Sequence, residues 1–93
     1  MRTIEIATAF KRDFKRESKG QNKANLNATL EAVLDSLIND LPLEPHYRDH
    51  DLTGNWLGYR ECHIKPDLLL IYRLADKDTL RLARLGSHSQ LFG

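Results

Sequence analysis

The sequence predicts an α+β fold in the order β-α-α-β-β-β, in which a helical hairpin packs on one face of a twisted, mainly antiparallel sheet. Two patterns predict this class. Apolar residues recur at helical spacing in the first half of the chain, whereas the second half contains three strand-like segments separated by short turns. A chain of 93 residues is predicted to form one domain over residues 1–93, because separate cores arise only in longer chains.

The first strand and helix are predicted between residues 3 and 20. Residues 3–7 alternate as a short strand with both isoleucines on one face. Thr8 is suited to cap a helix that runs to about Ser18, and Gly20 is expected to end it.

A second helix is expected to begin near Asn22 or Asn25 and to stop at Pro42, because proline lacks the amide proton that a helix needs. Its apolar stripe consists of Leu26, Leu30, Val33, Leu34, Leu37, Ile38 and Leu41. Such a stripe is typical of a helix that packs against a core.

The second half predicts a surface loop at residues 42–56 and then a β-meander. The strands are expected at residues 57–64, 68–75 and 79–85, with turns at residues 65–67 and 76–78. Because the run from Leu68 to Tyr72 is apolar on both faces, we expect the middle strand to be central. In the first strand of the meander, His63 and Glu61 share a polar face and Cys62 points the other way.

Charge is unevenly distributed along the chain. Residues 1–25 carry seven basic and three acidic side chains, whereas residues 26–45 carry four acidic side chains and no basic one. The formal net charge is only +1, which argues against a protein that coats nucleic acid by electrostatics alone. The basic segment is then either a solvated helix face or an edge that follows a phosphate backbone.

Cysteine usage and hydropathy predict a cytoplasmic protein without a membrane anchor. Cys62 is the single cysteine, so no internal disulfide is possible, and a reducing compartment fits best. The segment starting at Met1 carries the acidic Glu5 where a signal peptide would need an apolar run. His46 and His50 are four apart, but Pro45 makes a helix there unfavourable, so we predict no metal site.

The available side chains suit metal-free cleavage of an RNA phosphodiester. That reaction needs a base for the ribose 2′-hydroxyl, a cation for the charge on the phosphorus oxygens, and an acid for the departing 5′-oxygen. The sequence has candidates for each role among its histidines, aspartates and arginines. It contains no phosphate-binding glycine loop and no nucleophile motif. Phe92, close to the C-terminal end, could either fill the core or stack on a base.

Several spaced motifs resemble one known family. They are Tyr47-Arg48-Asp49-His50, Leu52-x-Gly54-x-Trp56-x-Gly58-Tyr59-Arg60, Cys62-His63-x-x-Pro66-Asp67-Leu68-Leu69-Leu70-Ile71-Tyr72 and Gly86-Ser87-His88-Ser89-Gln90-Leu91-Phe92. In this order they resemble the YafQ branch of the RelE/ParE toxin superfamily. The resemblance implies a RelE-like fold and a type II toxin that cleaves messenger RNA in the ribosomal A site without a metal or other cofactor. It also implies two partners, a cognate antitoxin and the ribosome with bound mRNA.

The resemblance also implies which residues act. The implied catalytic residues are His50, His63, Asp67, Arg84 and His88, and the implied RNA-binding residues are Phe92, Arg48, Arg60, Lys11 and Lys15. Within this scheme His88 is the general acid, either Asp67 or His50 is the base, His63 contacts the phosphate, and Arg84 stabilises the developing charge. His46 matches no family position and is expected to be structural. Leu68 stands where some relatives have an aromatic residue.

Two alternatives remain. A ParE-like toxin of the same fold would inhibit a protein target such as gyrase, and it would not need the four residues His50, His63, Asp67 and His88 together. A non-catalytic RNA-binding module would keep the basic residues but tolerate the loss of His88.

Overall fold

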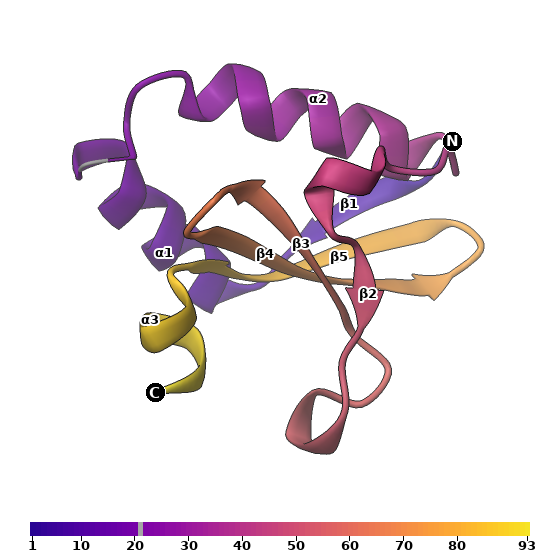
Figure 1. Ribbon diagram of the computed structural model, residues 1–93. Coiled ribbons are helices and arrows are strands. Elements are labelled where there is room, and N and C mark those ends of the chain that lie inside the picture. Colours follow the sequence, from indigo (N-terminus) through magenta and orange to yellow (C-terminus); the bar gives the residue numbers. More distant parts are fainter. Residues whose placement is uncertain (21) are drawn as a thin grey trace.

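The computed structural model describes residues 1–20 and 22–93, which form a five-stranded sheet and three α-helices (Figure 1). The strand order is β1-β5-β4-β3-β2, with β1 (Thr3–Ile6) parallel to β5 (Thr79–Gly86) and the other neighbours antiparallel. Helix α2 (Leu26–Ile38) covers one face of the sheet, and α1 (Thr8–Lys19) lies beside β5. The predicted α+β class is therefore confirmed.

Helix α1 starts differently from the prediction. Ala7 is the N-cap residue and no side chain caps the helix, so the expected cap by Thr8 is wrong. Thr8 already has helical conformation, because the Ala7 carbonyl accepts the Lys11 N–H at 3.1 Å. At the other end Gly20 is the C-cap as predicted, and its N–H donates to the Glu17 carbonyl.

Helix α2 ends at Ile38, three residues before Leu41, which the sequence placed in the apolar stripe. Asp40 adopts the left-handed conformation with φ of 56°, and the Leu41 N–H donates to the Ser36 carbonyl at 2.9 Å. This hydrogen bond is that of a Schellman ending, which turns the chain out of the helix. Leu41 is consequently 55% exposed, and its predicted burial is wrong.

The segment predicted as a loop contains three short elements. They are the 3₁₀ helices η1 (Pro45–Tyr47) and η2 (Gly54–Trp56), and the strand β2 (His50–Asp51) between them. Strand β2 pairs with β3 (Arg60–Lys65), which gives the sheet a fifth strand that the sequence did not indicate. The predicted strand at residues 57–64 begins only at Arg60, because Gly58 takes a positive φ of 94° that interrupts extended backbone.

The core lies between the two long helices and one face of the sheet. Its strand residues alternate along β3, β4 (Leu68–Asp76) and β5, and α2 supplies most of its helical residues. The members are Phe10, Leu26, Leu30, Val33, Leu37, Cys62, Ile64, Leu68, Leu70, Tyr72, Leu80, Leu82 and Leu85. Central strand β4 is buried on both faces from Leu68 to Tyr72, as predicted.

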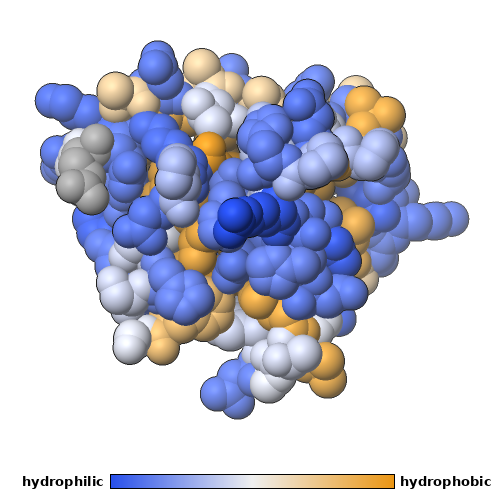
Figure 2. Space-filling view, in the orientation of Figure 1, coloured by the Kyte–Doolittle hydropathy of each residue, from blue (hydrophilic) through white to orange (hydrophobic). Residues whose placement is uncertain are grey.

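The face of the molecule seen in Figure 1 is mostly polar. Figure 2 shows this face, where apolar residues appear as separate patches among hydrophilic ones. Among the helices described, none is long and apolar enough to span a membrane.

Candidate functional site

The candidate site is built on the sheet face opposite the core, which we call the open face and define by Glu61, His63, Ile71 and Arg84. Strand register places one row of side chains across this face. The row consists of His50 on β2, Glu61 on β3, Ile71 on β4 and Arg84 on β5. His63 begins the next row, opposite Leu69. Three of the predicted catalytic residues therefore share one face, although they are far apart in sequence.

Two of these histidines flank a buried carboxylate. The Glu61 side chain is 6% exposed, and its Oε1 lies 3.6 Å from His50 Nε2 and 3.8 Å from His63 Nε2. The other ring nitrogens face carbonyl oxygens, at 2.7 Å for His50 Nδ1 and Arg48 and at 3.4 Å for His63 Nδ1 and Pro66. Only a ring protonated on both nitrogens could present an N–H to the carbonyl oxygen and a second N–H toward Glu61.

Asp67 and His88 meet at the neighbouring end of the sheet. Asp67 lies in the β3–β4 turn, and its Oδ1 is 3.5 Å from the backbone N of His88 at the start of α3 (His88–Phe92). Ser87 caps α3, because its hydroxyl accepts the Gln90 N–H and Gln90 Oε1 accepts the Ser87 N–H. This capping box gives the tail histidine a defined position.

Phe92 lies beside the proposed acid. Its ring centroid is 5.0 Å from that of His88, and the side chain stays exposed at 39%. The core-filling alternative is therefore wrong, whereas an exposed ring remains suited to stacking.

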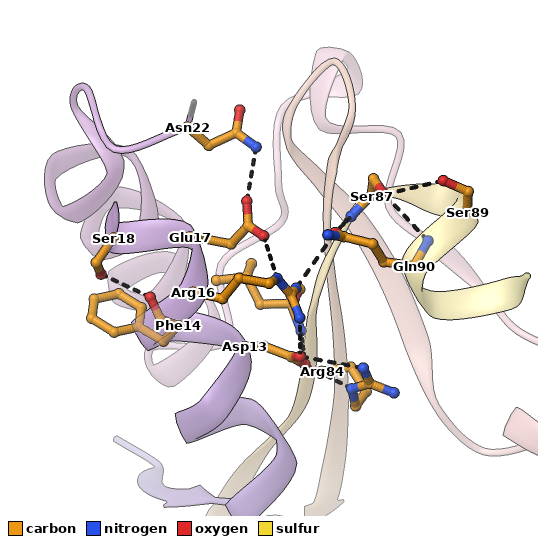
Figure 3. Close-up of polar contacts among 11 residues, drawn as sticks. Asp13, Phe14, Arg16, Glu17, Ser18, Asn22, Arg84, Ser87, Ser89 and Gln90 are labelled. Atoms are coloured by element: carbon orange, nitrogen blue, oxygen red, sulfur yellow. Dashed lines mark hydrogen bonds and ion pairs between the residues drawn. The ribbon is translucent and has the colours of Figure 1, made fainter. Parts of the chain in front are cut away.

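Arg84 is bound to helix α1 (Figure 3). Its Nε donates to Asp13 Oδ2 at 2.7 Å and its Nη2 to Asp13 Oδ1 at 3.2 Å. Its hydrogen bond to Asp13 raises the pKa of Arg84, so the guanidinium is permanently charged. The side chain is 28% exposed, which leaves part of it available to a ligand.

The predicted RNA-binding residues are dispersed. Arg48 is exposed at the end of η1 and lines a cavity of about 420 Å³ together with His63. Lys11 and Lys15 are exposed on α1, which packs by β5, whereas His50 lies on the opposite edge strand β2. The structure does not bring these lysines to His50.

Arg60, a predicted RNA contact, is already paired with carboxylates of its own chain. It lies opposite Tyr72 in the register, on the core side of the sheet. Its guanidinium donates to Asp49 at 2.8 Å and to Asp51 at 2.5 Å, and the hydrogen bond to Asp49 raises its pKa. Tyr72 donates its hydroxyl to the same Asp49, so Arg60 belongs to a structural ion-pair cluster.

Two cavities lie on either side of the β3–β4 turn. The one on the His63 side is lined by basic groups that include His46, Arg48 and Lys65. The one on the Asp67 side, about 470 Å³, lies between the C-terminal part of α1 and the start of α3. Asp67 and His63 therefore each adjoin a hollow large enough for part of a nucleotide.

The whole length of the chain matches one known family. Residues 2–93 match the family described as the bacterial toxin of type II toxin-antitoxin system, YafQ. The chain belongs to this toxin family. The resemblance in the motifs is thereby confirmed, and the RelE-like fold that it implied is also confirmed.

Curated relatives agree with this family. The chain is 54% identical over 55 residues to the mRNA interferase toxin YafQ of Escherichia coli strain K12, an alignment that covers 59% of each protein. It is 50% identical over 56 residues to the putative toxin YafQ of Haemophilus influenzae, covering 57% of this chain and 55% of that one. In these alignments the chain spans little more than half the length of the curated relatives.

Solved structures cover more of the chain. YafQ from Escherichia coli has a TM-score of 0.84 at 39% identity and covers 100% of both chains. The same coverage is found for YafQ in the E. coli DinJ-YafQ complex, at a TM-score of 0.84 and 40% identity. A metal-bound toxin from Helicobacter pylori has a TM-score of 0.88 at 44% identity and covers 99% of this chain and 100% of that one.

The prediction that no metal site forms from His46 and His50 stays a prediction. The His46 ring lies against Tyr47 in a tilted arrangement with ring centroids 4.1 Å apart, and its Nδ1 is 3.5 Å from Glu44. His50 extends from β2 instead of sharing a helix face with it. Across residues 1–20 and 22–93, no group of three or more histidine, cysteine or acidic side chains is placed to hold a metal ion.

Sequence reasoning missed Glu61 and Asp13. Strand parity placed Glu61 on the polar face with His63, but nothing indicated that the carboxylate is buried between two histidines. Asp13 looked like one acid in a basic helix, whereas the structure buries it against Arg84, 71 positions away. A signal for Asp13 was available, because it lies three residues after the inward-facing Phe10 and therefore on the buried side of the helix.

Proposed function

We propose that this chain is an endoribonuclease toxin of a type II toxin-antitoxin pair, which cleaves messenger RNA in the ribosomal A site and so inhibits translation. The observation that carries the proposal is the convergence of His50, His63 and Arg84 on the open face, with Asp67 and His88 at its adjacent end. These groups provide the base, the cations and the acid that RNA cleavage needs.

In the proposed reaction the ribose 2′-oxygen attacks the adjacent phosphorus and the bond to the 5′-oxygen breaks. Either Asp67 or His50 takes the 2′-hydroxyl proton, and His88 donates a proton to the departing 5′-oxygen. A 2′,3′-cyclic phosphate and a free 5′-hydroxyl result, with no metal in the reaction.

The strand spacing supports different positions around the substrate for His50 and Arg84. His50 and Arg84 are separated by three strand spacings, about 14 Å between backbones, so both can reach one phosphate only from opposite sides. His63 lies beside the basic cavity, where it would contact phosphate, and Arg84 would meet the charge that develops on the phosphorus oxygens. Phe92 would stack on a base next to His88.

The experiment that tests this function compares one message on programmed ribosomes and free in solution. Purified protein is stripped of metal with chelator, freed of the chelator and then added to ribosomes at constant Mg²⁺, with or without added Zn²⁺ or Cu²⁺, and the ends are mapped. We expect cuts only on ribosomes, at A-site codons, at equal rates in both solutions. Loss of cutting by the metal-stripped protein would overturn the metal-free step, which matters because the H. pylori relative is described as metal-bound.

Absence of cleavage on ribosomes by the folded protein would overturn the proposed function as a whole. Inhibition of gyrase by that protein would then identify the ParE-like alternative. RNA binding without cutting would identify the non-catalytic module.

We further propose a cognate antitoxin as partner, because the related YafQ forms a complex with DinJ. Co-expression of the cognate antitoxin should restore growth that the toxin alone stops. Continued growth arrest in the presence of a stable complex would contradict this.

A further inference from the structure

Side chains of helix α1 form hydrogen bonds with the backbone of β5 where β1 no longer pairs with it. Pairing between the two strands ends at Leu82, whose carbonyl accepts the Ala7 N–H at 3.0 Å. Further along β5, Asp13 Oδ2 accepts the Leu85 N–H at 3.0 Å, and Arg16 Nη2 donates to the Leu85 carbonyl at 2.8 Å. Two side chains of α1 thus replace a neighbouring strand at this edge.

The same carboxylate also binds Arg84 through both of its oxygens. Arg16 Nη1 adds a further hydrogen bond to Oδ1 at 3.0 Å, so four donor groups surround Asp13 (Figure 3). The Asp13 side chain is only 4% exposed. Burial by itself raises the pKa of Asp13, but the hydrogen bonds from Arg84, Leu85 and Arg16 and the positive charge of Arg84 outweigh it, and the pKa is lowered. Asp13 is therefore an anion at neutral pH.

We propose that Asp13 is a positioning residue for RNA cleavage, which orients the Arg84 guanidinium so that its remaining N–H groups face the scissile phosphodiester. The inference rests on the proposed function, because it takes Arg84 as the group that meets the phosphate charge. Asp13 occupies Nε and Nη2 of Arg84, while Nη1 has no hydrogen-bond partner within the described part of the chain. A guanidinium held at two points has a fixed plane.

This arrangement would favour catalysis because Arg84 loses its side-chain conformational entropy when the protein folds, before the substrate binds. A free arginine has many rotamers, and immobilising it in the transition state would cost free energy at that step. Donors that are already oriented toward developing charge avoid this cost.

Two other roles for Asp13 predict different results. If Asp13 only closes the sheet edge, its loss should slow cleavage equally whether or not Arg84 is present. If its negative charge weakens Arg84, its neutralisation should accelerate cleavage. The positioning role predicts a slower reaction only when Arg84 is present.

The test is a double-mutant cycle of Asp13→Asn and Arg84→Ala, with cleavage of a programmed message measured as kcat and KM. Asparagine keeps an oxygen for the Leu85 N–H but lacks the charge that fixes Arg84. We expect kcat to fall about 10-fold in Asp13→Asn, with KM nearly unchanged, and about 100-fold in Arg84→Ala. In the double variant we expect no loss beyond that of Arg84→Ala.

Glu5→Gln is the matched control. Glu5 also pairs with an arginine of β5, Arg81, at 2.5 Å, but it lies on the edge strand beyond the site. We expect its kcat to stay within about 2-fold of the wild type, as for a surface ion pair. Thermal melting of every variant shows whether it is folded.

A second variant and a spectrum keep the test decisive if Asp13→Asn does not fold. Arg84→Lys keeps the charge but cannot span both oxygens of Asp13, and we expect it to lose at least about 10-fold in kcat. In the wild type, NMR should show slow rotation of the Arg84 guanidinium.

Equal losses of Asp13→Asn in both backgrounds, a faster Asp13→Asn enzyme, full activity of Arg84→Lys or a freely rotating Arg84 would each overturn the inference. These results presuppose a wild type that cleaves. A wild type that does not cleave would instead overturn the proposed function, and the inference with it.

Discussion

Replacing His88 by alanine would remove the proposed general acid and leave the fold intact. The side chain is exposed, and the ring contact described for it is to Phe92, at 5.0 Å between centroids. The backbone N–H that faces Asp67 is kept by alanine. We therefore expect the free energy of unfolding to change by less than about 0.5 kcal/mol, which in a domain of this size moves Tm by less than about 4 °C.

Cleavage, by contrast, should slow about 10²- to 10⁴-fold in His88→Ala, which is the contribution typical of a general acid. The assay is single-turnover cutting of a programmed message at saturating protein, with a thermal melt of the same preparation. Lys77→Ala is the control, because Lys77 is also exposed but lies in the β4–β5 turn and is assigned no chemical role. Cleavage by folded His88→Ala within about 3-fold of the wild type would refute the assignment, whatever the control shows.

Three further predictions concern stability and the tail. Folding lowers the pKa of Asp13, so the ionised carboxylate stabilises the folded state at pH values above its ordinary pKa of 3.8. This stabilisation is lost as the pH falls through the pKa of the folded state. In an acid titration followed by circular dichroism, the stability of Asp13→Asn should therefore fall less steeply with pH than that of the wild type. Tyr72→Phe should destabilise by about 1–2 kcal/mol, seen in urea melts, because buried Tyr72 donates to the charged Asp49; an unchanged midpoint would contradict this. Gly86→Ala should slow cleavage and change Tm little. The new Cβ would lie 2.8 Å from Arg16 Nη2 and 2.9 Å from Gln90 Oε1, and displacing these side chains would move α3. Wild-type cleavage by Gly86→Ala would show that the two side chains can shift without moving α3.

The local pattern of the sequence was sufficient for the long elements. The helical stripe beginning at Leu26, the apolar run of β4 and the turn at residues 65–67 all lie where they were predicted. Each depends on residues within a few positions of one another, and periodicity and turn chemistry describe that range. The end of α2 was misplaced because Asp40 adopts a left-handed conformation that is usually left to glycine.

The identities of the candidate residues were also available from the sequence, since spaced motifs carried His50, His63, Asp67 and His88, and the family resemblance implied Arg84. The sequence did not show how these residues are grouped in space. Strand β2 comprises two residues, too few for any alternating pattern, yet its pairing with β3 brings His50 to within 3.6 Å of Glu61. The sequence also did not indicate which arginines form ion pairs, because Arg60 and Arg84 pair with carboxylates that are distant in the chain.

Fold class, family and the side chains available for chemistry could all be predicted from the amino-acid sequence. Burial, a shared face of the sheet and the pairing of charges could not, because they depend on how the elements pack. Propensity and periodicity act between near neighbours in the chain, whereas the contact between Asp13 and Arg84 spans 71 positions and exists only once α1 has packed against the edge of β5.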